Sequence, residues 1–188
     1  MVVAPYAGHS STIADFQNGQ SLVETLLDHG LDRLCVTDWK SATEARKSYD
    51  IDNYLAELNV CIDELGRSVN LIGLCQGGWL SAMYAARFPA KVRTLVLARA
   101  PIETDAGDGP VKSYAHTLPA AFYERLVKLG GGMLKGEYML AGFKSMHPDM
   151  QYVAKFREIY RNIDHPGHRR RFEEFELWYE HTLDLPGV

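Results

Sequence analysis

The sequence predicts an α/β fold in which a parallel sheet forms the middle of three layers, followed by a helical lid. Two observations carry this prediction. Over the first 100 residues, four short apolar runs alternate with helical patterns, an order typical of parallel sheets with right-handed crossovers. From Pro110 onward the patterns are helical, with no convincing buried strand. We therefore predict a core portion at residues 1–109 and a lid, or cap, at residues 110–188.

Each apolar run has the length of a strand and is rich in β-branched or leucine side chains. The runs lie at residues 2–6, 33–37, 69–74 and 92–98. We expect them to pair in parallel in the spatial order second, first, third, fourth. Between the first two runs, a helix is predicted at residues 15–29 with its apolar side chains inward, and Gly30 ends it.

The helix predicted at residues 51–65 shows the clearest amphipathic pattern in the chain. Its apolar side chains recur every three or four residues, and Gly66 follows it. A shorter helix is predicted at residues 79–87, because Pro89 cannot continue it. In the lid, residues 168–181 place four aromatic side chains on one side of a helix. They are Phe172, Phe175, Trp178 and Tyr179.

Composition narrows the functional classes. The 188 residues are 46% hydrophobic and 23% charged, so the chain can bury a core and is not a disordered tail. A net charge of −4 argues against a nucleic-acid-binding domain, because nothing would offset phosphate repulsion. No apolar run approaches the roughly 20 residues of a membrane span, and the start lacks the basic region of a secretory signal. Three cysteines do not make a disulfide framework, so we expect a soluble, cytoplasmic protein.

The two ends of the sequence suggest an excerpt of a larger domain. A strand-like run follows Met1 at once, and the chain stops shortly after a helical pattern without a cap. We therefore expect the domain to be truncated at both ends. A complete small domain with abrupt ends is the alternative.

Residues 73–78 (GLCQGG) lie between a predicted strand and a predicted helix. They match the Gly-x-nucleophile-x-Gly elbow of α/β-hydrolases, with Cys75 at the nucleophile position. The sharp turn lifts the sulfur out of the sheet, and Gly73, Gly77 and Gly78 avoid clashes where helix and strand approach. The N-terminus of the helix points toward the sulfur and favours its thiolate form. The alternative is an ordinary glycine-flanked turn with a buried thiol.

Backbone donors near the sulfur would stabilise the negative oxygen of a tetrahedral intermediate. The N–H of Gln76 is the first expected donor, because this residue follows the nucleophile. The second is expected from the loop after the first strand, at Ala7 and Gly8, where glycine allows close approach to a ligand. His9 lies in the same loop. We expect His9 to hold the loop by a hydrogen bond rather than to act as the base.

A thiol nucleophile needs a base, and the base needs an orienting acid. The five histidines that follow the elbow all lie in the predicted lid, and none follows a strand: His116, His147, His165, His168 and His181. Glu103 and Asp105 follow the fourth strand and are candidates for the acid, although a plain turn explains them equally well. We expect the acid and the base to lie beyond Val188.

The remaining candidate residues have plainer explanations. Cys35 falls in a predicted strand and Cys61 on the apolar face of a predicted helix, so we expect both to be small core residues. No spacing of cysteine and histidine resembles a zinc site, and we expect neither a metal nor a bound cofactor. Residues 169–171 (RRR) are expected to be a solvated helix face, and residues 130–132 (GGG) a hinge in the lid.

With these features the sequence resembles the polyhydroxyalkanoate synthases and intracellular polyhydroxyalkanoate depolymerases, α/β-hydrolases with a cysteine nucleophile. The elbow at residues 73–78 is similar to that of the synthases. Residues 4–9 (APYAGH) and 37–39 (TDW) look more like the depolymerases. Residues 172–187 resemble a lid segment that, in these families, precedes further core strands with the aspartate and histidine. Because this sequence lacks both, we expect the 188-residue piece alone to be inactive.

The resemblance implies acyl transfer on (R)-3-hydroxyacyl esters or thioesters, with Cys75 carrying the acyl chain as a thioester. A synthase would take this chain from a coenzyme A thioester and extend a polyester, whereas a depolymerase would pass it to water or a thiol. The mixed motifs leave the two activities and the chain-length preference open. A polyester granule and a second copy of the chain are further candidate partners. An alternative of another class is a non-catalytic hydrolase-fold module that binds granules or a partner through the lid.

Overall fold

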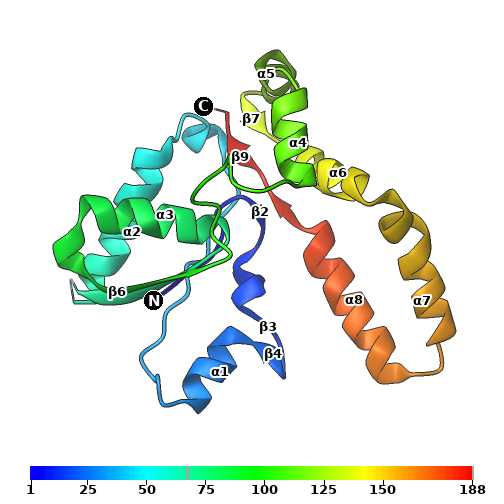
Figure 1. Ribbon diagram of the computed structural model, residues 1–188, viewed down its shortest axis with the longest axis horizontal. Coiled ribbons are helices and arrows are strands. Elements are labelled where there is room, and N and C mark those ends of the chain that lie inside the picture. The colour runs from blue at the N-terminus through cyan, green and yellow to red at the C-terminus, as the bar shows by residue number, and fades with distance from the viewer. Residues whose placement is uncertain (67, 188) are drawn as a thin grey trace.

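The computed structural model describes residues 1–66 and 68–187, as an α/β core from which a series of helices extends (Figure 1). The strands are β1 (Val2–Val3), β2 (Gly8–His9), β3 (Asp15–Gln17), β4 (Gln20–Ser21), β5 (Val69–Leu74), β6 (Val92–Ala98), β7 (Met133–Leu134), β8 (Thr182–Leu183) and β9 (Leu185–Pro186). The α-helices are α1 (Leu22–Asp28), α2 (Ile51–Glu64), α3 (Gln76–Arg87), α4 (Pro110–Thr117), α5 (Ala120–Leu129), α6 (Gly136–Met146), α7 (Lys155–Arg161) and α8 (Pro166–Glu180). Short helical turns are η1 (Ser11–Ala14), η2 (Glu44–Arg46), η3 (Pro89–Lys91) and η4 (Met150–Ala154).

The central sheet is parallel, with its strands in the order β1-β5-β6. Val36 extends the sheet on the other side of β1 through a single parallel bridge to Val2. The spatial order predicted for the four apolar runs is therefore confirmed. β5 and β6 also have the bounds predicted for the third and fourth strands.

The first two predicted strands are wrong in length. β1 keeps only the first two residues of its apolar run, and the second run contributes only its one bridge. One cause is Pro5, which has no N–H with which to continue a ladder. The other is that side chains bind the backbone of Ala4 instead. Its N–H donates to Thr37 Oγ1 (2.9 Å), and its carbonyl accepts from Trp39 Nε1 (3.0 Å).

One face of the sheet carries the main core. Along β5, buried residues alternate with more exposed ones, as expected for a strand covered on one side. Helices α2 and α3 supply the covering layer, and α2 confirms the helix predicted from its amphipathic pattern. Burial of each large side chain contributes about 1.5–3 kcal/mol. The buried side chains of this cluster include Val3, Leu55, Leu58, Ile62, Leu71, Leu80 and Tyr84.

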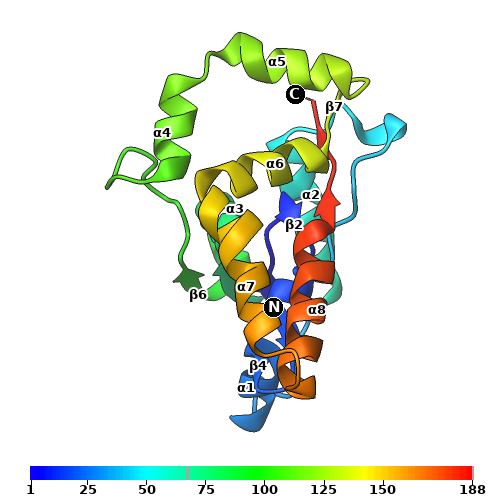
Figure 2. The same ribbon diagram turned by 90° about the vertical axis from the view of Figure 1, so that its right-hand side faces the viewer.

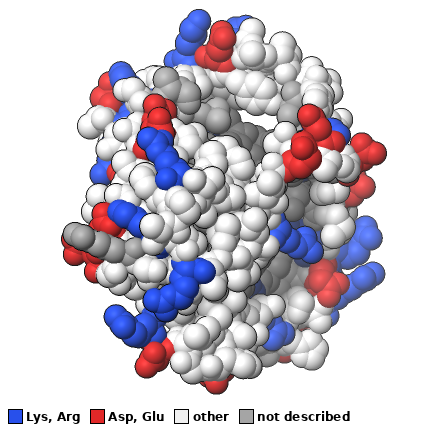
Figure 3. Space-filling view, turned by 60° about the vertical axis from the view of Figure 1, so that its left-hand side comes forward, with Lys and Arg blue, Asp and Glu red and all other residues white. Residues whose placement is uncertain are grey.

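The opposite face of the sheet is less covered. Val96 of β6 pairs with Ile72 of β5 and is 51% exposed. The second helical layer of the predicted three-layer fold stays a prediction. Figure 3 shows that the side of the molecule bearing the core has a broad uncharged band, with Lys, Arg, Asp and Glu gathered toward its margins.

The helix predicted at residues 15–29 is wrong in its first part. β3 and β4 form an antiparallel hairpin there, with Gly19 at φ +76° in the turn, and α1 follows. Ser21 fixes the start of α1 because its hydroxyl accepts a hydrogen bond from the N–H of Glu24 (2.9 Å). None of the seven residues of α1 is buried. Gly30, at φ +81°, ends the helix as predicted.

From α4 to α8 the chain is mainly helical, and these helices extend to one side of the core (Figures 1 and 2). α7 and α8 lie side by side, and Lys155 of α7 donates to Glu176 of α8 (2.6 Å). On α8 itself, Arg170 pairs with Glu174 (2.7 Å), one turn further along the helix. The three glycines at residues 130–132 form the turn between α5 and β7.

The tail after α8 contains two short strands that the sequence pattern did not indicate. β8 pairs antiparallel with β2, and β9 pairs antiparallel with β7. Leu183 of β8 is buried, so the expectation of no buried strand after Pro110 is wrong. Two-residue strands are too short to produce a recognisable alternation in the sequence. β8 thus joins the C-terminal tail to the loop that follows β1, and β9 joins it to the segment between α5 and α6.

Asp184, between β8 and β9, ties the tail to α6. Its carboxylate accepts from the N–H of Gly136 (2.9 Å) and from Lys135 Nζ (2.8 Å). Its backbone N–H donates to Ser41 Oγ (3.1 Å), and its carbonyl accepts from the N–H of Ala42 (2.9 Å). Burial raises the pKa of Asp184, but the hydrogen bonds from Lys135 and Gly136 outweigh that effect and leave the pKa below its usual value.

Replacing Asp184 by alanine is expected to lower the free energy of unfolding by about 1–2 kcal/mol, mainly because the N–H of Gly136 loses its acceptor. Asp184→Asn keeps an acceptor oxygen and serves as the matched control. Urea titration followed by circular dichroism measures the difference. Equal midpoints for the alanine variant and the unmodified protein would show that the tail is not held by this side chain.

Within residues 1–66 and 68–187, no helix combines the length and the apolar composition needed to cross a membrane.

Candidate active site

Cys75 occupies the turn between β5 and α3, where the sequence places the nucleophile elbow. Its backbone has φ +51° and ψ −119°, a conformation that is strained for a residue with a side chain. The turn is held by hydrogen bonds from the Cys75 N–H to the carbonyl of Ala98 (2.8 Å) and from the Gly78 N–H to the carbonyl of Cys75 (2.9 Å). The Cys75 residue is exposed. This exposure contradicts the buried thiol that the glycine-flanked-turn alternative requires.

The three glycines of the elbow are required because neighbouring atoms leave no room for a Cβ at any of them. A Cβ on Gly73 would lie 2.3 Å from the Cα of Gly78. A Cβ on Gly77 would lie 2.1 Å from the carbonyl oxygen of Val3, and one on Gly78 would lie 2.5 Å from the Cβ of Ala100. All three distances are far below contact distance. The glycines thus let α3 approach β1, β5 and the end of β6 at once.

Gln76 and Ala7 meet beside the elbow, although they lie on different elements. Gln76 is the first residue of α3, so its N–H has no carbonyl partner inside the helix. The N–H of Ala7 donates to the side-chain oxygen Oε1 of Gln76 (3.1 Å). The structure therefore brings together Gln76 and Ala7, the residues of two predicted oxyanion donors. The donor of Ala7 is bound to the amide oxygen of the Gln76 side chain. This contact of the Gln76 side chain left no signal in the sequence.

Gly8 is buried and has φ +85°, a value that favours glycine. It belongs to β2 and pairs with Leu183 of β8, so the C-terminal tail fixes its position. A Cβ on Gly8 would lie 3.7 Å from Cε2 of Phe143 on α6. The predicted oxyanion loop thus lies between β8 of the C-terminal tail and α6.

Residues around the second apolar run fix the loop from the core side. Thr37 accepts a hydrogen bond from the N–H of Ala4, and Trp39 donates one to the carbonyl oxygen of Ala4. Next along the loop, the ring of Tyr6 lies 4.4 Å from the ring of Tyr54 on α2, centroid to centroid. Burial raises the pKa of Tyr6 to about 12. The resemblance of residues 37–39 to the depolymerases did not indicate this positioning role.

His9 lies between the loop and the lid. Its Nε2 lies 2.9 Å from the carbonyl oxygen of Tyr179 on α8, a hydrogen bond of the kind expected to hold the loop. The imidazole also lies against three aromatic rings, with centroid distances of 5.9 Å to Phe143, 4.7 Å to Trp178 and 4.9 Å to Tyr179. Burial lowers the pKa of His9, although the bond to Tyr179 acts in the opposite direction. The folded protein therefore favours the neutral imidazole.

Acidification below pH 6.5 is expected to destabilise the protein through His9. The unfolded chain takes up a proton near the ordinary histidine value of 6.5, whereas the folded chain resists it, so stability falls as the pH falls. An ion pair between Lys144 of α6 and Glu180 of α8 joins the two helices whose aromatic rings contact His9. Comparing urea midpoints at pH 7.5 and 5.5 in the unmodified protein and in His9→Phe measures the contribution. An equal midpoint change in both proteins would contradict this role.

Among the described residues, no hydrogen bond joins Cys75 to a histidine side chain. Asp105 lies 3.7 Å from His116 Nε2, but both side chains are mostly exposed. The N–H of Asp105 donates to Glu103 Oε1 (3.0 Å), and Lys112 binds the carbonyl oxygen of Asp105 (2.6 Å), which agrees with the plain-turn alternative. The acid and the base therefore stay predictions.

Cys35 and Cys61 are both exposed, so the expectation that they are core residues is wrong. The segment around Cys35 pairs only through the single bridge of Val36 and therefore does not form a buried strand. On α2 the fully buried stripe runs through Leu58 and Ile62. At about 100° per residue, Cys61 falls at the edge of that stripe.

Arg99 is a strained residue that the sequence did not reveal. It follows β6 and has φ +52°, beside the carbonyl of Ala98 that accepts from Cys75. Cys75 and Arg99, both strained, thus follow the carboxyl ends of the neighbouring strands β5 and β6. Ligands of parallel α/β sheets bind at this edge of the sheet.

Comparison with known proteins agrees with the resemblance seen at the elbow. The family described as "Protein of unknown function (DUF3141)" matches residues 1–187. The chain is also similar to proteins named poly(3-hydroxyalkanoate) polymerase subunit PhaC. It is 37% identical to the Synechocystis protein over 183 residues, 30% to the Haloferax mediterranei protein and 27% to the Allochromatium vinosum protein, both over 181. Each match covers 93% of this chain but 48%, 36% and 50% of the respective relative. The relationship to polyhydroxyalkanoate synthases is thereby confirmed, and the chain spans at most about half the length of these relatives.

Proposed function

We propose that this chain, which belongs to the DUF3141 family, carries the nucleophile of a cysteine acyltransferase that acts on (R)-3-hydroxyacyl thioesters in polyhydroxyalkanoate metabolism. The observation that supports this most strongly is the exposed, strained Cys75 at the start of α3, with the N–H of Ala7 directed toward the neighbouring side chain of Gln76. The similarity to polymerase subunits supports the substrate class.

The proposal includes the α/β-hydrolase fold, with its core portion at residues 1–109 and its lid at residues 110–188. The parallel sheet, the elbow between β5 and α3, and the helices that begin at Pro110 support it. The acid, the base and a second helical layer would come from the natural full-length protein.

In the first half-reaction, the thiol of Cys75 gives its proton to the base, and its sulfur attacks the carbonyl carbon of the acyl group. A C–S bond forms, and one electron pair of the carbonyl moves onto oxygen. The N–H groups of Gln76 and Ala7 would bind this oxyanion. For that, the oxyanion replaces Gln76 Oε1, the acceptor that Ala7 now contacts at 3.1 Å.

Collapse of the intermediate breaks the bond to coenzyme A, whose sulfur takes the proton from the base. The acyl chain then remains on Cys75 as a thioester. In the second half-reaction, a hydroxyl group of another 3-hydroxyacyl unit gives its proton to the base and attacks this thioester. An ester bond forms, and the sulfur of Cys75 leaves and is reprotonated.

The same acyl-enzyme would act as a depolymerase if water or a thiol were the acceptor, so the experiment measures both directions. The natural full-length protein is incubated separately with (R)-3-hydroxybutyryl-coenzyme A and with amorphous polyester. The proposal expects release of free coenzyme A from the first and little soluble acid from the second. The reverse result would establish the depolymerase activity. No reaction with either substrate would favour the non-catalytic binding module.

A further inference from the structure

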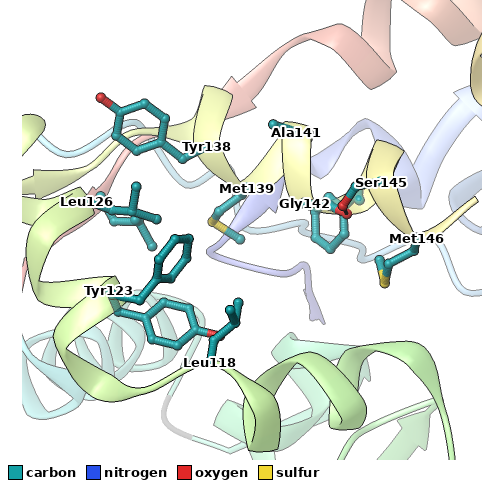
Figure 4. A pocket seen from close by; sticks show the side chains of 12 residues that line it. Leu118, Tyr123, Leu126, Tyr138, Met139, Ala141, Gly142, Ser145 and Met146 are labelled. Carbon is teal, nitrogen blue, oxygen red and sulfur yellow. Dashed lines mark hydrogen bonds between the residues drawn. The ribbon is translucent and has the colours of Figure 1, made fainter. Parts of the chain in front are cut away.

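The lid contains an apolar pocket that the reaction described above does not use. It lies between α5 and α6 and has a volume of about 590 Å³. Figure 4 shows Tyr123 and Leu126 on one side of the pocket and Met139 on the other. Its walls continue along α6 through Gly142 and Phe143. The volume falls within the range of roughly 300–1,000 Å³ typical of ligand sites.

The lining of the pocket defines the chemistry of its ligand. None of the described residues that line it carries a charge. A carboxylate, a phosphate or the nucleotide part of coenzyme A would lose its hydration there without a partner, which is costly. Among these described residues, the polar side-chain groups are the hydroxyls of Tyr123, Tyr138 and Ser145, and the Ser145 hydroxyl donates to the carbonyl oxygen of Gly142 (2.7 Å). Such walls suit a neutral, mainly aliphatic chain with isolated hydrogen-bond acceptors.

One lining residue of the pocket also lies against the predicted oxyanion loop. Phe143 lines the pocket, and its Cε2 would lie 3.7 Å from a Cβ on Gly8. The ring of Phe143 also lies 5.9 Å, centroid to centroid, from His9 in the same loop. One end of the pocket thus adjoins the loop whose Ala7 contacts Gln76, the neighbour of Cys75.

We propose that this pocket binds the aliphatic polyester chain that is attached to, or released from, Cys75. The inference rests on the proposed function, because the polyester is its product. An aliphatic polyester is neutral along its length, and each repeat offers ester oxygens to hydroxyl donors. At about 30 Å³ for each water molecule, the pocket has the volume of roughly 20 waters, which is enough for a short segment of such a chain.

Gly142 offers a direct way to fill the pocket. It lines the pocket on α6, and a Cβ placed on it meets no atom within 4 Å. A Gly142→Trp substitution therefore projects a large side chain into open space without a clash at its base. Gly167 on α8 is the matched control, since its Cβ also meets no atom within 4 Å and it does not line the pocket. Ala141→Trp is a second filling variant from the same wall.

The test measures binding of the methyl ester of the linear (R)-3-hydroxybutyrate trimer by calorimetry. It uses the natural full-length protein with Cys75→Ala, so that no covalent step contributes. Gly142→Trp and Ala141→Trp are each expected to weaken trimer binding at least tenfold, and Gly167→Trp less than twofold. Circular dichroism confirms that each variant is folded.

The outcomes separate this inference from the proposed function. Trimer binding that is absent, or that is unchanged in both filling variants, would overturn the pocket assignment even if the protein with Cys75 releases coenzyme A. Pocket-dependent trimer binding without any coenzyme A release would leave the assignment standing and refute the acyltransferase. If light scattering showed a dimer that Gly142→Trp dissociates, the pocket would hold a second copy of the chain, and the inference would fail.

Discussion

Replacing Cys75 by alanine is expected to reduce coenzyme A release from (R)-3-hydroxybutyryl-coenzyme A by at least ~10³-fold, because the reaction loses its nucleophile. The substitution removes only the exposed sulfur at the turn, so the protein should remain folded. The assay follows free thiol over time in the natural full-length protein. Circular dichroism of the same samples shows whether the loss comes from chemistry or from unfolding.

The chain supplies two matched controls for this substitution. Cys35 and Cys61 are also exposed, yet neither lies at a strained turn before a helix. Cys35→Ala and Cys61→Ala should each retain activity within about twofold, since surface substitutions away from the site have small effects. A Cys75→Ala protein that is folded and still active would show that the elbow does not carry the reaction.

Gly77→Ala is expected to lower the free energy of unfolding by about 3 kcal/mol or to prevent folding, because the added Cβ overlaps a rigid backbone. That Cβ would lie 2.1 Å from the carbonyl oxygen of Val3 and 2.7 Å from that of Ala4. Val3 belongs to β1, which pairs with β5 on one side and with Val36 on the other, and Ala4 follows it directly, so neither oxygen moves without displacing β1. Urea unfolding followed by circular dichroism measures the change.

Gly142→Ala is the control for the glycine prediction. A Cβ at Gly142 meets nothing within 4 Å, and the residue lies inside α6. Alanine is better than glycine in a helix by up to about 1 kcal/mol, so this variant should be as stable as the unmodified protein or more so. Equal unfolding midpoints for Gly77→Ala and Gly142→Ala would contradict the close approach of α3 and β1.

The sequence was most informative where local pattern and tertiary burial agree. The apolar runs that became β5 and β6 pair with each other along their length, and α2 packs a regular stripe on the sheet. The elbow was recognisable because Cys75 and its three glycines, Gly73, Gly77 and Gly78, fall within six consecutive residues. In each case the pattern that predicts the element lies within one continuous segment of the sequence.

The sequence was least informative where distant segments decide the backbone. β1 ends early because Thr37 and Trp39 bind Ala4 in place of a strand. β8 and β9 exist only because the tail meets β2 and β7. The exposure of Cys61 likewise depends on which part of α2 the sheet covers. None of these contacts leaves a periodic signal in the segments concerned.

The same distinction applies to the candidate site. The position of Cys75 follows from six consecutive residues. Other contacts of the site join residues that are far apart in the chain. Ala7 binds Gln76, and His9 contacts α6 and α8. The acid and the base were expected beyond Val188, and the structure places no histidine against the nucleophile within its described residues.

The central claim is that the sulfur of Cys75, and no other, receives the acyl chain. Intact-protein and peptide mass spectrometry after brief incubation with (R)-3-hydroxybutyryl-coenzyme A tests it directly, because all three cysteines are exposed and exposure alone cannot bias the result. We expect one hydroxyacyl adduct, on the peptide containing Cys75, which hydroxylamine removes as it does other thioesters. Adducts spread equally over Cys35, Cys61 and Cys75, or confined to either of the first two, would contradict the account.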